Sequence, residues 1–384
     1  MSSVTRVVVV GAGIIGASCA YYAARSGLDV TVIDRGGVAG GTTGAGEGNL
    51  LVSDKGPGPE LELALRSLDL WVELGAELGT ASFELEHKGG LVVASSDAAM
   101  TALQEFAATQ HDAGVACENV SPRELAELEP WIAEDVAGGV LYPADAQVQP
   151  GLAAARLLEA AVALGADLRL GEECVALRTA GGSVQAVITR SGVIETGFVV
   201  NAGGPWAGAL ADLWDLPLPI HPRRGFVLVT EPLPPVIRHK VYSADYVANV
   251  TSGSEELETS TVVEGTPSGT VLIGASRERV GFSDEWDPGV VQRLAERAVA
   301  LFPPLARVGL MRTYHGFRPY CPDHLPVVGL DSRMQGVLHA SGHEGAGIVL
   351  APATGELVTQ LITDEQPAGY AGALSPDRLT LVAS

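Results

Sequence analysis

The chain has 384 residues, 47% of them hydrophobic and 18% charged, which is typical of a folded protein with a large core. Its formal net charge of -22 leaves no basic surface for nucleic acid or an anionic membrane. The four cysteines lie far apart, so they predict neither a disulfide framework nor a metal site. With no signal peptide and no membrane-spanning run in the sequence, we expect a protein of the reducing cytoplasm.

The first 35 residues carry the strongest motif. Arg6–Val10 predicts a buried strand, and Gly11, Gly13 and Gly16 follow it in G-x-G-x-x-G spacing. The first glycine permits a tight turn, the second lets a pyrophosphate approach the backbone, and the third lets a helix pack on the sheet. A helix over 14–26 and a strand over 28–33 then place Asp34 about 20 residues downstream, where a carboxylate can accept ribose hydroxyls. The segment therefore predicts a dinucleotide site.

The identity of the dinucleotide stays open at this point. Asp34 would repel a 2′-phosphate, so NADP is disfavoured even though Arg35 follows it. NAD and FAD both fit the motif.

The next segments alternate loops and helices. Seven of the fourteen residues 36–49 are glycine, and threonines, Glu47 and Asn49 interrupt them, which favours an ordered loop against a ligand over a flexible linker. Helices are predicted over 60–78 and 97–113, with a strand over 89–94 between them. A capping-box start at Ser121 predicts a short helix, and Gln149 begins a long one that ends at 164.

The second half is mostly strands. Strands are predicted over 167–170, 184–189 and 192–200, then over 226–230, 260–263 and 270–273, with a helix over 290–302. A strand over 336–340, a glycine loop over 342–347 and a helix over 348–363 return to the opening pattern. This order indicates an α/β fold, α+β overall, in which a β-rich domain interrupts a Rossmann-like domain twice. We expect residues 1–83, 147–215 and 323–384 in the Rossmann-like domain and 84–146 and 216–322 in the inserted one.

Six segments resemble the D-amino-acid oxidase family of flavoproteins, which includes glycine oxidase, sarcosine oxidase and related amine dehydrogenases. They occur in the family's order and span the chain: Gly11–Gly16, Thr42-Thr43, Glu47-Gly48-Asn49, Val199–Trp206, Gly316-Phe-Arg-Pro319 with Pro322-Asp323, and Gly342–Gly347. The resemblance implies a Rossmann-like FAD-binding domain and a β-rich substrate domain that roofs the flavin.

The resemblance also implies which residues hold FAD. The last glycine loop would place backbone N–H groups and a helix N-terminus at the flavin edge that becomes negative on reduction. The implied cofactor-binding residues are Gly11, Gly13, Ile14, Ile15, Gly16, Asp34, Arg35, Thr42, Thr43, Glu47, Gly48, Asn49, Val175 through its backbone at the adenine, Ala202, Gly203, Trp206, Gly342, His343, Glu344, Gly345, Ala346, Gly347 and Ile348.

Arg318 is the main candidate for substrate binding. By resemblance its guanidinium grips the substrate carboxylate, for which a planar fork is suited. Tyr242 and Tyr246 lie where relatives place an active-site tyrosine, with half-buried sheet packing as the alternative. No catalytic base is expected, because hydride transfer from a neutral amine needs orientation above all.

Two departures from the family limit the resemblance. The sarcosine oxidases attach FAD through a cysteine six residues before the Pro-Asp pair, where this chain has Gly316, so we expect non-covalent FAD. Those oxidases also activate oxygen with a lysine in a strand that reads Thr270-Val-Leu-Ile-Gly274 here. Oxidase and dehydrogenase activity therefore both stay open.

The predicted function is oxidation of the C–N bond of a small amino acid or N-substituted glycine-like amine to an imine, which water hydrolyses. The electron acceptor is oxygen or a carrier, and a homo- or hetero-oligomer is possible. Two rival hypotheses are an NAD-dependent dehydrogenase and a flavin-binding, non-catalytic subunit of a larger complex.

Overall fold

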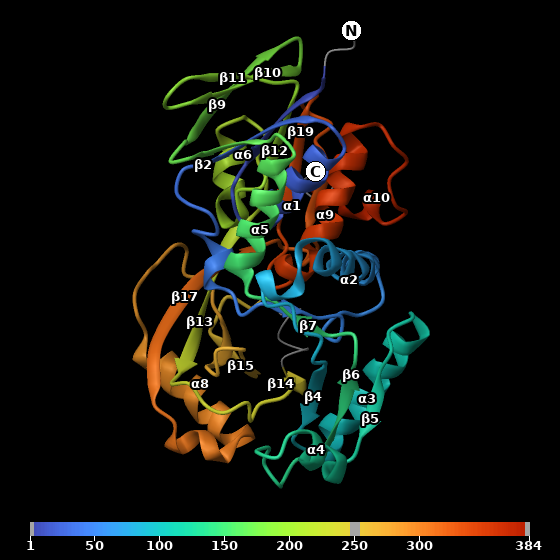
Figure 1. The fold of residues 1–384 in the computed structure, drawn as a ribbon, viewed down its shortest axis with the longest axis vertical. Coiled ribbons are helices and arrows are strands. Elements are labelled where there is room, and N and C mark those ends of the chain that lie inside the picture. Colours follow the sequence, from blue (N-terminus) through green and yellow to red (C-terminus); the bar gives the residue numbers. More distant parts are fainter. Residues whose placement is uncertain (1–3, 246–253, 381–384) are drawn as a thin grey trace.

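The computed structural model describes residues 4–245 and 254–380. Two large sheets lie at opposite ends of the molecule, as Figure 1 shows, with both chain termini near the upper one. Each proposed domain contains one of these sheets.

The upper sheet is mainly parallel and has β1 at its centre. Strand β1 pairs in parallel with β2 on one side and with β12 on the other, while β18 is antiparallel to β19 at one edge. Its order is β18 (Val327–Leu330), β19 (Val337–Ser341), β12 (Phe198–Asn201), β1 (Arg6–Val10), β2 (Asp29–Asp34), β8 (Asp167–Leu170). This is a doubly wound arrangement, whose ligands bind beyond the carboxyl ends of the strands.

Both faces of the upper sheet are covered. Because side chains alternate along a strand, Val7 and Val9 of β1 join one core cluster, while Val8 and Val10 join another. The first cluster includes residues of α1 (Ile14–Arg25), α5 (Pro150–Ala163) and α9 (Gly347–Ile362), and the second includes residues of β9 (Cys174–Ala180), β10 (Ser183–Thr189) and β11 (Val193–Glu195). The two packed faces explain the unbroken valine run of β1.

The lower sheet is mainly antiparallel. Its order is β17 (Leu310–Tyr320), β13 (His221–Thr230), β16 (Val271–Arg277), β15 (Glu258–Gly265), β14 (Lys240–Ser243), β4 (Gly90–Ala94), β6 (Gly138–Tyr142), β5 (Glu118–Val120). On one face Phe226 and Leu228 pack in a cluster with Val290 and Leu294 of α8 (Pro288–Leu301). The alternate residues Gly225 and Val227 therefore face the other way, toward the upper sheet.

The remaining elements connect or flank the sheets. Strands β3 (Asn49–Leu50) and β7 (Ala146–Gln147) form a short pair. The other helices are α2 (Pro59–Leu78), α3 (Asp97–Asp112), α4 (Pro122–Leu128), α6 (Ala207–Asp212), α10 (Ala371–Leu374), α11 (Asp377–Thr380) and the 3-10 turns η1 (Thr42–Ala45), η2 (Thr80–Ser82), η3 (Gly204–Trp206) and η4 (Pro303–Arg307).

The fold agrees with the sequence prediction in its helices and in the expected strands, but several strands have no counterpart in that prediction: β3, β5, β6, β7, β9, β14, β17 and β18. The predicted helices all form, with ends within two residues of the expected ones. The single strand predicted over 192–200 forms as two strands, β11 and β12, with a break at Thr196 and Gly197. Thr196 Oγ1 donates to the carbonyls of Arg6 and Phe198, which fixes this break.

Candidate functional site

A cavity of about 700 Å³ lies where the upper sheet meets the lower one. On the upper side it is bordered by residues at the carboxyl ends of β1, β2 and β12, among them Val10, Asp34 and Ala202. On the lower side it is bordered by β13 and β17, through Val227 and Arg318. Its position matches the ligand site of doubly wound sheets, and its volume lies in the range of small-molecule and cofactor sites.

Most residues predicted to hold the cofactor line this one cavity. Those that line it are Gly11, Gly13, Ile14, Ile15, Asp34, Arg35, Thr42, Thr43, Glu47, Gly48, Asn49, Ala202, Gly203, Trp206, His343, Glu344, Gly345, Gly347 and Ile348. Gly16, Gly342, Ala346 and Val175 do not. The cavity thus brings together segments that lie more than 300 residues apart in the chain.

The first glycine loop is packed too closely for other residues. A Cβ on Gly11, whose φ is +122°, would lie 2.3 Å from the carbonyl oxygen of Ala202, and one on Gly16 would lie 1.9 Å from the Gly11 oxygen. Gly16 therefore seats α1 on the sheet and does not contact the ligand space. The Ile14 N–H donates to Thr43 Oγ1 at 3.0 Å, so the loop after β2 lies against the start of α1.

Asp34 and Arg35 take different positions at the rim. Asp34 accepts the N–H groups of Ala12 (2.8 Å) and Gly36 (2.7 Å), which hold its carboxylate toward the cavity. Arg35 stacks on the ring of Trp206, with 4.4 Å from Cζ to the ring centroid, and Phe282 stacks parallel to the same ring. The guanidinium of Arg35 and the ring of Trp206 both line this end of the cavity.

Two buried oxygens in the cavity wall indicate a missing polar ligand. Glu47 Oε1 and Asn49 Oδ1 have no hydrogen-bond partner among residues 4–245 and 254–380. Both residues line the cavity, and Glu47 is 8% exposed. Buried polar atoms are normally satisfied, so a ligand with hydrogen-bond donors, or water, belongs beside them. The polar wall, the glycine cradle and the cavity volume together fit a dinucleotide such as FAD.

The last glycine loop supplies a helix N-terminus and a neutral histidine. Helix α9 begins at Gly347, which lines the cavity, so its positive end faces the ligand space. Burial lowers the pKa of His343 to about 3, and its Nε2 lies 3.0 Å from Thr354 Oγ1. The Glu344 carboxylate pairs with Arg223 (3.5 Å) and lies 2.9 Å from His324 Nδ1. His343 therefore contributes no charge here.

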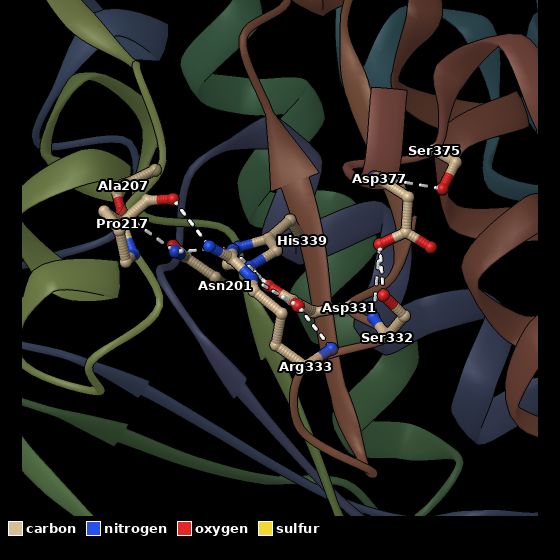
Figure 2. A network of polar contacts seen from close by, with 9 residues as sticks. All are labelled: Asn201, Ala207, Pro217, Asp331, Ser332, Arg333, His339, Ser375 and Asp377. Atoms are coloured by element: carbon tan, nitrogen blue, oxygen red, sulfur yellow. Dashed lines mark hydrogen bonds and ion pairs between the residues drawn. The ribbon is translucent and has the colours of Figure 1, made fainter. Parts of the chain in front are cut away.

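The loop after β12 is fixed from behind by a buried polar chain. Figure 2 shows Asn201, His339, Asp331 and Arg333 in a row. Asn201 Oδ1 accepts the N–H of Gly203 at 3.2 Å, and its Nδ2 lies 3.3 Å from His339 Nδ1. His339 Nε2 lies 3.0 Å from Asp331 Oδ2, which also pairs with Arg333 at 2.6 Å. Since Asp331 is an acceptor, His339 carries a proton on Nε2, and the chain orients the Gly203 backbone.

Arg318 places a guanidinium in the cavity wall. It lies on β17, and its Nη1 donates to the carbonyl oxygen of Ser276 in β16 at 2.9 Å. The side chain therefore reaches across β13, the strand between them. It also lies next to Gly345, since a Cβ added at that glycine would be 3.8 Å from Arg318 Nε. The last glycine loop and this cation thus face the same space.

Two predicted positions need correction, and a third lies outside the described residues. Tyr242 does not line the cavity: it is fully buried in β14 and its hydroxyl donates to Ser53, which in turn bonds to Asp145. It is a core residue, as the alternative interpretation has it. Val175, expected to contact the adenine through its backbone, is not among the lining residues, whereas the preceding Glu173 and Cys174 border the cavity. Tyr246 lies outside the described residues.

Several residues that line the cavity are not predicted from the sequence. They are mostly small or apolar and carry no chemical signal, among them Leu210, Gly225, Val227 and Ser341. Gly41, Ala45 and Gly204 line the wall as well, but they lie inside segments that the sequence places against the ligand. Gly225 alone has a recognisable signal, because a glycine inside a strand pattern marks a close approach of other atoms. Gly316, the first residue of the Gly316-Phe-Arg-Pro319 segment, is not expected to contact the cofactor, yet it lines the cavity too.

Cys321 is not placed for attachment to a ligand in the cavity. It is fully buried outside the cavity lining, and its Sγ donates to Asp323 Oδ1 at 3.1 Å. Burial raises the pKa of this thiol to about 12. Across the described ranges, no helix is long and apolar enough to cross a membrane, and no three His, Cys, Asp or Glu side chains group as metal ligands would.

Comparison with known proteins identifies the family. Residues 6–361 match the family model DAO, described as FAD dependent oxidoreductase, so the chain belongs to this family and is an FAD-dependent enzyme. It is 28% identical over 407 residues to hydrogen cyanide synthase subunit HcnC of Pseudomonas aeruginosa, covering 95% of this chain and 94% of that protein. The solved glycine oxidase of Geobacillus kaustophilus superposes with a TM-score of 0.87 at 27% identity, covering 97% and 98% of the two chains.

A third relative is longer than this chain. The bifunctional protein ThiO/ThiG of Trichormus variabilis is 33% identical over 243 residues, which is 62% of this chain. The match spans 34% of that protein, about a third of its length.

Proposed function

We propose that the protein oxidises the C–N bond of a small, carboxylate-bearing amine, such as glycine or an N-substituted glycine, to an imine that water hydrolyses. One observation carries this proposal: the Arg318 guanidinium borders the same cavity as the dinucleotide loop and the last glycine loop. A fixed guanidinium suits a carboxylate. The relatives named glycine oxidase support the same substrate class.

The residues of this chain would hold FAD along the cavity. Gly11, Gly13 and the start of α1 would receive the pyrophosphate, and Asp34 the adenosine ribose. The loop that contains Glu47 and the last glycine loop would border the ring, which when bound supplies a two-electron acceptor for a hydride. We infer that FAD is bound without a covalent bond, because Cys321 is buried as a protonated thiol away from the cavity.

Each wall then has a separate task. Arg318 binds the carboxylate and so aims the neighbouring Cα–H bond, which supports orientation as the main contribution of the protein. The N-terminus of α9 stabilises negative charge that develops beside it. No wall residue is assigned as a base, and His343 stays neutral because burial disfavours its protonation.

Flavin reduction without oxygen tests this proposal directly. The purified protein is expected to show bound flavin absorption. Under anaerobic conditions glycine, sarcosine, proline or a D-amino acid should bleach it, and readmitting air shows whether oxygen serves as acceptor. Failure of every amine to bleach the flavin would favour the rival hypothesis of a flavin-binding, non-catalytic subunit.

A further inference from the structure

We propose that two facing glycines in the lower sheet divide the positioning work of the site: Gly225 seats the Arg318 guanidinium, and Gly316 seats the loop that borders the flavin. The two residues are cross-strand partners in β13 and β17, and both line the cavity. The inference rests on the proposed function, because it takes the Arg318 guanidinium as the carboxylate site.

Gly225 makes room for the guanidinium. A Cβ at this position would lie 2.1 Å from Arg318 Nη1 and 2.9 Å from its Cζ. It would also lie 2.4 Å from the Ser276 carbonyl oxygen, which is the acceptor that anchors Nη1. The guanidinium therefore occupies the space above Gly225 that a side chain would fill, with its Nη1 end fixed to β16. Any side chain here displaces the cation or its anchor.

Gly316 makes room for a different group. A Cβ here would lie 2.4 Å from the Cβ of Ala45, while the Ala45 backbone lies 3.7 Å away. Ala45 ends η1, and Thr42 at the start of η1 donates its hydroxyl to the Phe317 carbonyl. Strand β17 thus holds the loop through Gly316 and Phe317, and a side chain at Gly316 pushes the loop, which itself lines the cavity, away from β17.

Substitution of alanine at these two glycines should therefore impair different functions of the site, carboxylate binding in one case and FAD binding in the other. Gly225→Ala is expected to weaken carboxylate binding and to leave FAD affinity within about twofold of the wild type. Gly316→Ala is expected to raise the Kd of FAD about tenfold or more. A cation moved by about 1 Å is expected to cost on the order of 100-fold in kcat/KM for the carboxylate substrate.

Two binding measurements test this. FAD affinity is measured by fluorescence titration of the apoprotein. Carboxylate binding is measured on the FAD-loaded protein from the shift of the flavin absorption spectrum on adding acetate, with acetamide as the neutral probe of the same shape. Gly225→Ala should lose acetate binding and keep its acetamide response, whereas a general folding defect would weaken both. Gly192→Ala, where a Cβ would meet no atom within 4 Å, is the control.

A double-mutant cycle shows whether Gly225 acts through Arg318. With Arg318→Ala already present, Gly225→Ala should cause no further loss of acetate binding, because the displaced group is gone. A further loss of the same size as in the wild type would overturn the proposal. If Gly225→Ala does not fold by itself, it is combined with Arg318→Lys. The smaller head group of lysine leaves space above β13, and acetate binding of this double variant is compared with that of Arg318→Lys alone.

The outcomes separate this inference from the proposed function. If acetate does not perturb the wild-type flavin, or Arg318→Ala binds it normally, the carboxylate site itself is wrong and the inference is overturned with it. If Arg318→Ala measurably weakens acetate binding but Gly225→Ala does not weaken it, only the inference is wrong. Equal FAD affinities for Gly316→Ala and the wild type would refute the second half.

Discussion

Asp331→Asn should destabilise the protein from a position outside the cavity. Asp331 is 2% exposed, and its two oxygens accept four hydrogen bonds: Arg333 Nη2 at 2.6 Å, Arg333 Nε at 2.8 Å, Arg333 N at 3.0 Å and His339 Nε2 at 3.0 Å. An asparagine of the same shape loses the charge and turns one acceptor into a donor that faces other donors. Figure 2 shows Asp331 between His339 and Arg333.

The magnitude follows from the burial of the pair. Removing one partner from a buried ion pair costs about 3–5 kcal/mol, and a hydrogen bond to a charged group contributes about 1.5–3 kcal/mol. The side chain of Arg333 is 29% exposed, so water can solvate part of the guanidinium when the carboxylate is removed, and the cost lies at the low end of this range. We therefore expect Asp331→Asn to lower the free energy of unfolding by about 3 kcal/mol.

A second Asp-x-Arg pair in the chain provides a matched control. Asp167 pairs with Arg169 at 2.7 Å with the same spacing, but the two side chains are 53% and 45% exposed. An exposed pair contributes at most about 1 kcal/mol. In urea unfolding at pH 7, Asp331→Asn should therefore have a clearly lower midpoint urea concentration than Asp167→Asn. If Asp331→Asn unfolds at the same urea concentration as Asp167→Asn, the reasoning is wrong.

The effect should also depend on pH with a fixed sign. Burial alone would raise the pKa of Asp331, but hydrogen bonds from Arg333 and His339 outweigh it and lower the pKa well below its ordinary value. The stability that Asp331 contributes is then complete above the unfolded pKa, near 4, and is lost as the pH falls below it toward the folded pKa. The difference between wild type and Asp331→Asn should be constant from pH 7 to 5 and shrink toward pH 3. A difference that grows on acidification would contradict this.

Two further predictions concern the cofactor. Gly48→Ala should raise the Kd of FAD at least about tenfold in a titration of the apoprotein, because the φ of Gly48 is +99° and a Cβ would lie 1.9 Å from the Val148 oxygen. The control is Gly165→Ala, which should keep wild-type affinity for FAD: the φ of Gly165 is +106°, but a Cβ there would meet no atom within 4 Å. Acid precipitation should release all flavin into the supernatant, from the wild type and from Cys321→Ser alike; a yellow pellet from the wild type alone would show a covalent bond at the thiol.

The parts of the fold that can be predicted from the sequence are those with a local cause. The βαβ unit is predictable because the valines of β1, the three glycines and Asp34 each have one structural reason at fixed spacing. The strand β9 is missed because only Cys174 in it is buried, so its sequence lacks the alternation that marks a strand. An edge hairpin held by its neighbours carries little signal of its own.

The candidate site is less predictable, because its geometry depends on contacts between distant segments. Arg318 is found through its resemblance to a family motif, but its path across β13 to Ser276 depends on the register of three strands. Tyr242 has the residue type and the position expected of a site residue, yet the pleat of β14 turns it toward Ser53. A shift by one residue would reverse that direction, and the register of β14 depends on its pairing with β15 and the distant β4, which a local pattern does not reveal.

The two sheets contribute different kinds of group to the cavity, and this bears on how substrate preference can change. The upper sheet offers backbone: the turn at Gly11, the loop at Gly203 and the start of α9. Such groups bind any anionic cofactor of the right shape, and at Gly11 the packing is too close for any side chain. The lower sheet offers the Arg318 side chain over a glycine floor. A change in the amine that is oxidised therefore requires substitutions in β13, β16 and β17, and these can occur without loss of the dinucleotide site, provided that Gly316 still admits the loop at Ala45.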